Sequence, residues 1–233
     1  MKKVLVLVAI AVLTCSVAAA KVNSGIHDSV DDLVLVPKMD LTASNTAMYV
    51  AAYASTSPDN INVNIDGWTT ATSTYIKIFT PTDIGEVGLS QRHRGVWDNE
   101  KYRIEFTYSV ASNEIIDILE DHVRIEGLQL KYTSDANTQI ALRVIGDGIV
   151  HISKNIAHGV ISGTAIGNGF GSHSTSNAQI YFTNNIAYGW QNSGTSAGFV
   201  AGNDTGGASY YYHNTASGND RGFLRSTGYP IMT

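Results

Sequence analysis

Arg124, His151 and Lys154 are side chains that could together promote proton transfer beside a negatively charged group. A guanidinium or ammonium group neutralises a carboxylate, and a neighbouring histidine can then remove the adjacent proton. Hydrolysis of a glycoside would instead need two carboxylates at a matched separation, for which Glu126 and Asp147 are the pair that we can name. Calcium needs several oxygen ligands, and the seven histidines have no metal-ligand spacing. The three basic residues are therefore the catalytic candidates, and we predict no metal and no cofactor.

Tyr181, Tyr210 and Tyr212 form, together with His151, a set of candidates for ligand binding. They occupy outward positions of repeated strands, in line with Arg124. A tyrosine ring has an apolar face and a hydroxyl at its edge, so a row of such rings could hold a sugar chain. The other interpretation is structural, because aromatic pairs on neighbouring strands stabilise a sheet by about 0.2–1 kcal/mol each. Both interpretations stay open.

A repeat places these residues in line. The segment Ile152–Gly159 returns as Phe182–Gly189 and again as Tyr211–Gly218, and its asparagines Asn155, Asn185 and Asn214 stand 30 and 29 residues apart. A period of this length is typical of repeat proteins, in which each unit buries its apolar face by stacking on its neighbours.

The start of each repeat alternates like a strand with one buried face. The pattern predicts parallel coils about 4.8 Å apart, in which each buried aliphatic side chain contributes roughly 1.5–3 kcal/mol. We expect the asparagines to form tight left-handed turns and to stack their amides along the column. A loop-rich β-sandwich is the alternative. The predicted inward columns are Val150/Ile180/Ser209, Ile152/Phe182/Tyr211 and Ile156/Ile186/Thr215.

The segments 180–189 and 123–128 resemble the right-handed parallel β-helix (pectate-lyase-like) proteins of bacterial secretomes. The resemblance covers roughly residues 68–228. It implies an all-β, right-handed parallel β-helix solenoid with a short N-terminal capping helix, and a substrate that lies along an outer sheet. The superfamily includes polysaccharide lyases, glycoside hydrolases, phage tailspikes and adhesins, so the resemblance implies a fold and no single activity.

Residues 1–20 have the pattern of a secretory signal peptide: Lys2 and Lys3, an apolar core, and small residues at 18–20. We therefore expect a secreted or cell-surface protein, extracellular or periplasmic, with no membrane association after signal removal. Cys15 lies inside this segment, so the mature chain would have no disulfide; a lipoprotein is the alternative interpretation of this cysteine. The net charge of −5, with few basic runs, argues against a nucleic-acid partner.

We expect residues 21–58 to form a lead-in with a capping helix over Leu41–Ala54, capped at Ser44, Asn45 or Thr46. Residues 59–233 would form one parallel β-helix, whose C-terminal end is either truncated or stacks on further coils or another chain. Short alternating segments predict its remaining strands at 60–66, 75–79, 102–106, 115–119, 123–130, 140–144 and 222–225.

Three further motifs have both a functional and a structural interpretation. Gly194–Gly198 matches a nucleophile elbow around Ser196, with Asp204 and His213 following, but no helix follows it as that motif requires. Gly167–Gly171 lacks the helix of a phosphate loop and is predicted to be a turn where a bulky side chain would clash. Gln91–Arg94 is either an anion site or a solvated polar loop.

The leading prediction is a secreted β-helix module without catalysis, which binds carbohydrate or displays a surface and whose partner is a polysaccharide or cell-surface glycan. The alternative is a polysaccharide lyase or other carbohydrate-active enzyme that acts on an acidic polysaccharide. A purely structural part of a larger adhesin is a third hypothesis.

Overall fold

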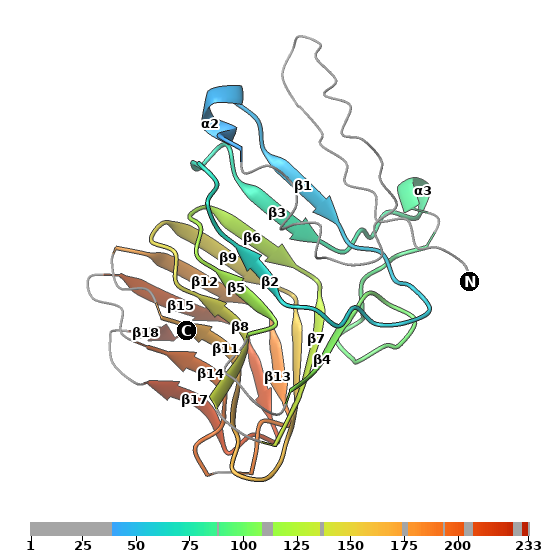
Figure 1. The fold of residues 1–233 in the computed structure, drawn as a ribbon, viewed down its shortest axis with the longest axis vertical. Coiled ribbons are helices and arrows are strands. Elements are labelled where there is room, and N and C mark those ends of the chain that lie inside the picture. The colour runs from blue at the N-terminus through green and yellow to red at the C-terminus, as the bar shows by residue number, and fades with distance from the viewer. Residues whose placement is uncertain are drawn as a thin grey trace.

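The computed structural model describes residues 39–87, 89–108, 114–135, 138–173, 177–192, 194–202, 207–225 and 230–232. The predicted signal peptide and residues 21–38 of the predicted lead-in lie outside these residues. The described chain winds into a parallel β-helix with three sheets (Figure 1). The fold class predicted from the repeat is confirmed, and the β-sandwich alternative is wrong.

The coils that begin at β3, β6, β9, β12 and β15 each contribute one strand to each of three sheets, and the strand pairs between successive coils are parallel. The seven-stranded sheet contains β1 (Met48–Ala51), β3 (Ile76–Phe79), β6 (Val123–Glu126), β9 (Ile149–Ser153), β12 (Gln179–Thr183), β15 (Ala208–Tyr212) and β18 (Pro230–Met232). The five-stranded sheet contains β4 (Ile104–Tyr108), β7 (Gln129–Ser134), β10 (Ile156–Ile161), β13 (Ile186–Tyr188) and β16 (Thr215–Ser217). The six-stranded sheet contains β2 (Val63–Ile65), β5 (Ile116–Ile118), β8 (Thr138–Val144), β11 (Ile166–Ser172), β14 (Ala197–Ala201) and β17 (Arg221–Arg225).

The register of the seven-stranded sheet agrees with the repeat. Ile152, Phe182 and Tyr211 lie in register on neighbouring strands, and so do Val150, Ile180 and Ser209. The rings of Phe182 and Tyr211 stack with their centroids 5.0 Å apart. These two inward columns are therefore buried in register, as the 29- to 30-residue period predicts.

The third predicted inward column is wrong for two of its three members. Ile156, Ile186 and Thr215 do lie in register and Ile156 is fully buried, but Thr215 is exposed and Ile186 is only half-buried. Since Lys154 bends the chain in a left-handed conformation (φ 56°) and the next side chain points inward, the alternation shifts by one residue after the bend. On β10, β13 and β16 the next residue points inward instead: Ala157 and Ala187 are in the core, and Ala216 packs against it.

The bend between the first two sheets is built differently from the prediction. The left-handed residue is the one before each asparagine, with φ values of 56° at Lys154, 56° at Asn184 and 54° at His213. Asn155 and Asn185 are fully buried, and their amides form a ladder. The predicted stacking of amides is confirmed, whereas the left-handed turn is formed by their neighbours.

Asn185 makes hydrogen bonds both up and down this ladder. Its Oδ1 accepts from the Asn155 backbone N–H (3.0 Å) and the Asn155 Nδ2 (3.1 Å). Its own Nδ2 donates to the Ile152 carbonyl (2.8 Å) and to Asn214 Oδ1 (3.1 Å). These bonds satisfy buried backbone groups that the change of direction removes from the sheets.

The segment Gly167–Gly171 is part of strand β11 and not a turn, although the predicted steric reason for its glycines holds. A Cβ added at Gly167 would meet the Trp190 ring at 2.8 Å, and one at Gly159 would meet it at 2.6 Å. Trp190 is fully buried, and its Nε1 donates to the Ala157 carbonyl at 3.1 Å. The glycines therefore make room for the indole inside the coil.

The predicted helix over Leu41–Ala54 is mostly wrong. Helix α2 spans only Leu41–Ser44; Asp40 caps its start, and Asn45 ends it in a left-handed conformation (φ 48°). The chain then forms β1, the edge strand of the seven-stranded sheet, with Met48 and Val50 buried. The alternation that turns Met48 and Val50 toward the core outweighs the helical spacing of the apolar residues. A second short helix, α3 (Ile84–Val87), was not predicted.

We predict that Asn185→Leu lowers the free energy of unfolding by about 3–5 kcal/mol, because it removes the hydrogen bonds that Asn185 makes to the buried backbone N–H and Nδ2 of Asn155 and to the carbonyl of Ile152. Leucine fits this position sterically, since Leu128 occupies the equivalent place two coils earlier. Denaturant unfolding measures the loss.

The matched control is Asn184→Gly at the adjacent, exposed asparagine, where glycine tolerates the left-handed backbone. This variant should change the free energy of unfolding by no more than about 0.5 kcal/mol. Equal losses at both positions would contradict the role of the buried amides.

Candidate functional site

The outer face of the seven-stranded sheet brings together the residues that the repeat places in line. Arg124, His151, Tyr181 and Tyr210 are consecutive register partners on β6, β9, β12 and β15. We call these four residues the outer column. Tyr212 lies beside the column, with its ring centroid 6.3 Å from that of Tyr210. All five side chains are partly exposed.

The rings of the outer column stack on one another. The centroids of His151 and Tyr181 are 4.9 Å apart with an interplanar angle of 13°, and those of Tyr181 and Tyr210 are 4.7 Å apart with an angle of 9°. Tyr181 therefore has an aromatic neighbour on each face. What this part of the column presents to solvent is a row of ring edges and hydroxyls.

Arg124 continues the column toward the N-terminal coils. Its guanidinium carbon lies 3.6 Å from the centroid of the Tyr75 ring, a cation–π contact. Among the described residues no carboxylate forms an ion pair with Arg124. Burial and the nearby Arg124 charge both lower the pKa of His151, so this imidazole is neutral at neutral pH.

Glu126, at the end of β6, binds three cations. Its carboxylate accepts from Lys77 at 2.8 Å, Arg92 at 2.9 Å and Lys154 at 3.0 Å. Burial by itself would raise the pKa of this carboxyl, but the hydrogen bonds from Lys77 and Lys154 and the charge of Arg92 outweigh it and lower the pKa to about 2. Glu126 is thus a fixed anion that fastens β3, β6, the residue after β9 and the loop before β4 to one another.

The loop Gln91–Arg94 is neither a site for an external anion nor a fully solvated loop. Arg92 does bind an anion, but this anion is the protein's own Glu126, and its guanidinium also donates to the Thr80 carbonyl at 3.0 Å. His93 is buried, with its Nε2 2.8 Å from the Lys154 carbonyl oxygen. Of these four residues only Arg94 is exposed, and the bonds of Arg92 and His93 hold the loop across the bend.

The three catalytic candidates do not converge on one point. Arg124 and His151 are neighbours in the column, whereas the Lys154 ammonium is engaged by Glu126. Glu126 is in register with Ser153, the last residue of β9, whereas Asp147 lies before the start of that strand, which spans about 13 Å at about 3.3 Å per residue. A glycosidase carboxylate pair needs about 5–9.5 Å, so this pair is not one.

The nucleophile-elbow match has a structural explanation. Ser196 is fully buried, and its Oγ accepts a hydrogen bond from the Gly167 backbone N–H at 3.1 Å. The strand β14 begins directly after it, where the elbow motif needs a helix. Asp204 lies outside the described residues. Ser196 therefore connects two coils and does not face solvent as a nucleophile would.

The described residues contain no group of three or more His, Cys, Asp or Glu placed to hold a metal ion. In the same part of the chain, no helix is long and apolar enough to cross a membrane.

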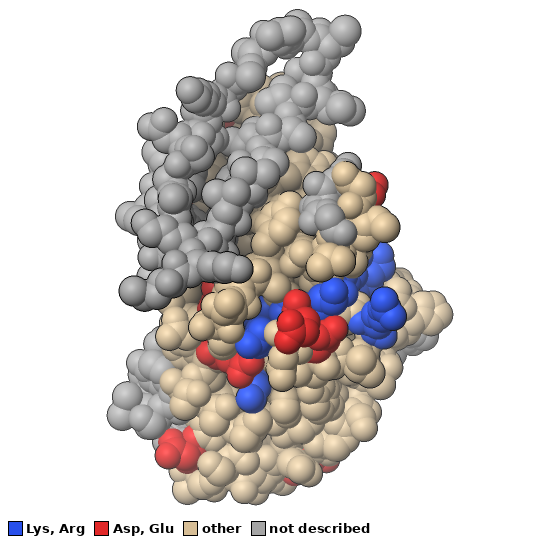
Figure 2. Space-filling view, turned by 90° about the vertical axis from the view of Figure 1, so that its right-hand side faces the viewer, with Lys and Arg blue, Asp and Glu red and all other residues tan. Residues whose placement is uncertain are grey.

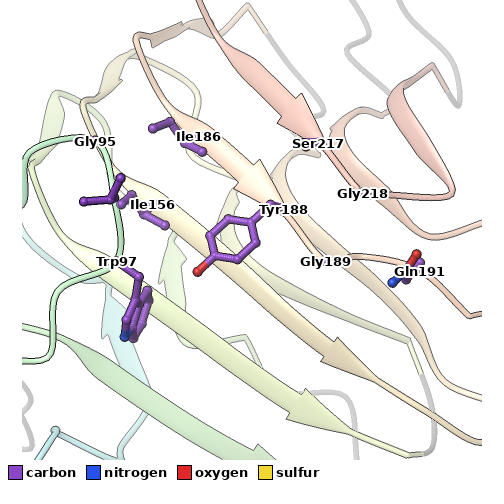
Figure 3. Close-up of a pocket in the computed structure, with 10 residues that line it drawn as sticks. Gly95, Trp97, Ile156, Ile186, Tyr188, Gly189, Gln191, Ser217 and Gly218 are labelled. Atoms are coloured by element: carbon purple, nitrogen blue, oxygen red, sulfur yellow. The ribbon is translucent and has the colours of Figure 1, made fainter.

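A groove that the sequence did not predict lies on the outer face of the five-stranded sheet (Figure 3). The segment 95–97 forms one side of it, and Ile186 and Tyr188 of β13 lie along it. The sequence signal for this groove is the alternation of Ile186 and Tyr188. The repeat pattern predicts Ile186 in the core and so conceals this signal.

Comparison with known proteins adds no relative: no family model, no curated protein and no solved structure matches this chain. The parallel β-helix therefore rests on the strand topology, and function has to be argued from the surface.

We predict that Glu126 makes the stability of the protein depend on pH in acid. The pKa of Glu126 is about 2 in the folded state and about 4.5 when unfolded, so its stabilising effect is complete above pH about 4.5 and is lost as the pH falls toward 2. The difference in free energy of unfolding between the wild type and Glu126→Gln should shrink over this window. Denaturant unfolding at a series of pH values measures it.

Two partner variants give the matched comparison. Arg92→Met removes a largely buried cation, since the Arg92 side chain is 16% exposed and that of Lys154 is 52% exposed. Arg92→Met should therefore narrow the pH range over which Glu126 changes the stability more than Lys154→Met does. A constant difference between the wild type and Glu126→Gln from pH 6 to about 2 would contradict the assignment.

Proposed function

We propose that this protein is a non-catalytic module that binds a polysaccharide or cell-surface glycan along the outer column, outside the cell or in the periplasm. The signal-peptide pattern of residues 1–20 supports this location. The observation that carries the binding proposal is the unbroken line of Arg124, His151, Tyr181 and Tyr210 on one sheet face.

The geometry changes the expected mode of binding. Because Tyr181 is sandwiched between His151 and Tyr210, a sugar ring has little free aromatic face to stack on there. The tyrosine hydroxyls remain at the surface; that of Tyr181 donates to Gln179 Oε1 at 3.0 Å. A glycan on this column would contact hydroxyls and ring edges, and it would follow the coil axis along strands about 4.8 Å apart.

The stack also rigidifies the surface. Side chains that are held by their neighbours lose little rotamer entropy when a ligand binds, which favours affinity. The structural role and the binding role of the tyrosines are therefore compatible.

A second candidate function, a polysaccharide lyase, is favoured by one observation. His151 is neutral at neutral pH and is the register neighbour of Arg124, so a proton acceptor lies beside a cation that no described carboxylate neutralises. Lys154 does not join them, because it is bound to Glu126.

We predict that Tyr181→Ala weakens retention on a polysaccharide affinity gel or glycan array by about three- to ten-fold, through loss of the ring and its hydroxyl. The protein should stay folded, since two lost stacking contacts cost only about 1–3 kcal/mol. Tyr53→Ala is the matched control, because it removes a half-buried tyrosine beyond the end of β1.

Retention that is equal for the wild type and Tyr181→Ala would refute the binding role of the column. The same incubations distinguish the second candidate: unsaturated oligosaccharides released from an acidic polysaccharide by the wild type, but not by His151→Ala, would establish a lyase in place of a binding module.

A further inference from the structure

The groove on the five-stranded sheet has a cavity volume of about 430 Å³ and opens to solvent. Its lining includes Trp97, Ile186, Tyr188, Gln191, Ser217 and Gly218. It lies on a different sheet from the outer column. Its size is within the range of small-ligand sites, which are mostly apolar with a few polar groups.

Tyr188 differs from Tyr181 of the outer column, because among the described residues an aromatic ring stacks on only one of its faces. On one side its ring stacks on His158, with centroids 4.3 Å apart and an interplanar angle of 17°. On the other side its register partner is Ser217, a small and exposed residue that lines the groove. The free face of the ring is therefore part of the groove.

Trp97 forms a second aromatic surface nearby. Its ring packs edge-on against His158 with centroids 5.8 Å apart, and its Nε1 donates to Asn99 Oδ1 at 2.9 Å. The indole is thus fixed against the same histidine that supports Tyr188. Two aromatic side chains are held in place before any ligand arrives.

The groove is uncharged. None of the described residues that line it is acidic or basic. The nearest charges on this sheet, Glu105 and Lys131, pair with each other at 3.1 Å, and burial lowers the pKa of His158 so that it is neutral at neutral pH. Figure 2 views the side of the molecule on which β4, β7 and β13 lie: charged side chains gather in a band across the middle, and the lower part is mostly uncharged.

We propose that this groove binds an uncharged sugar residue of a glycan, with the apolar face of the sugar on the free face of Tyr188. Gln191 and Ser217, both exposed, would hydrogen-bond the sugar hydroxyls, and Trp97 would contact the ring from the side. An ionised ligand would find no opposite charge here, and a purely apolar one would leave the two polar groups without partners. The proposal concerns a separate site and does not depend on the outer column.

Tryptophan fluorescence reports directly on this groove. Trp68 and Trp190 are buried and Trp97 is only partly so, which makes acrylamide quenching mainly a measure of Trp97. The full chain is titrated with cellohexaose, xylohexaose and maltohexaose at millimolar concentrations. We expect at least one of them to protect Trp97 from quenching, and Tyr188→Ala to weaken that binding by about ten-fold.

Two more variants separate binding from folding. Ser217→Phe fills the groove from an exposed position and should abolish protection, whereas Val160→Ala shortens an exposed side chain on the neighbouring strand β10, away from the groove, and should leave the affinity unchanged. Thermal unfolding confirms that each variant is folded. The proposal would be overturned if none of the three oligosaccharides protected Trp97 from quenching, or if the wild type and Ser217→Phe bound with equal affinity. It would also be overturned if protection changed with the protein concentration and not with the oligosaccharide concentration.

Discussion

The ladder of buried asparagine amides is the interaction on which the rest of the structure depends. A β-helix has to turn its chain between sheets, and each turn takes backbone groups out of the regular strand pairing. Asn155 and Asn185 satisfy these groups from inside the coil while their amides bond to the asparagine of the next coil. Because an amide carries both donors and an acceptor, one residue type repeated at one position can bond upward, downward and to the backbone.

The same bend determines where the surface columns lie. The left-handed residue before each asparagine ends one alternation and starts another, so His151, Tyr181 and Tyr210 face outward on one sheet while Ile186 and Tyr188 face outward on the next. The loop around Arg92 and His93 is fastened across this bend by Glu126 and the Lys154 carbonyl. The same loop places Trp97 against His158, and Trp97 forms one side of the groove. The fastened bend and the groove are therefore two consequences of one loop.

The sequence was sufficient for the fold and for the register of the outer column, because like residues recur at a constant spacing and a parallel coil is the arrangement that superimposes them. It failed where a local departure changes the pattern. The left-handed residue before Asn185 turns Ile186 outward, whereas the repeat predicted it to point inward, so the groove was not predicted. Around Met48 and Val50 the helical spacing of apolar residues predicted a helix, whereas the structure follows their strand-like alternation. The partners of Glu126 could not be predicted, since Arg92 reaches it from 34 residues away through a loop without a repeat.

The most direct test of the account is disulfide trapping, since the in-register stacking of coils underlies every surface assignment. In a Cys15→Ser background the chain has no cysteine, and Ser153→Cys combined with Thr183→Cys places two thiols at register partners on β9 and β12. Their Cα separation of about 4.8 Å lies within the range that a disulfide spans. The control, Ser153→Cys with Gln179→Cys, displaces one thiol by four residues, or about 13 Å.

The account predicts rapid and nearly complete oxidation of the 153/183 pair with an unchanged circular dichroism spectrum, and no disulfide in the 153/179 pair. Similar oxidation of both pairs, or of the control alone, would contradict the parallel, in-register coil and the surface columns derived from it.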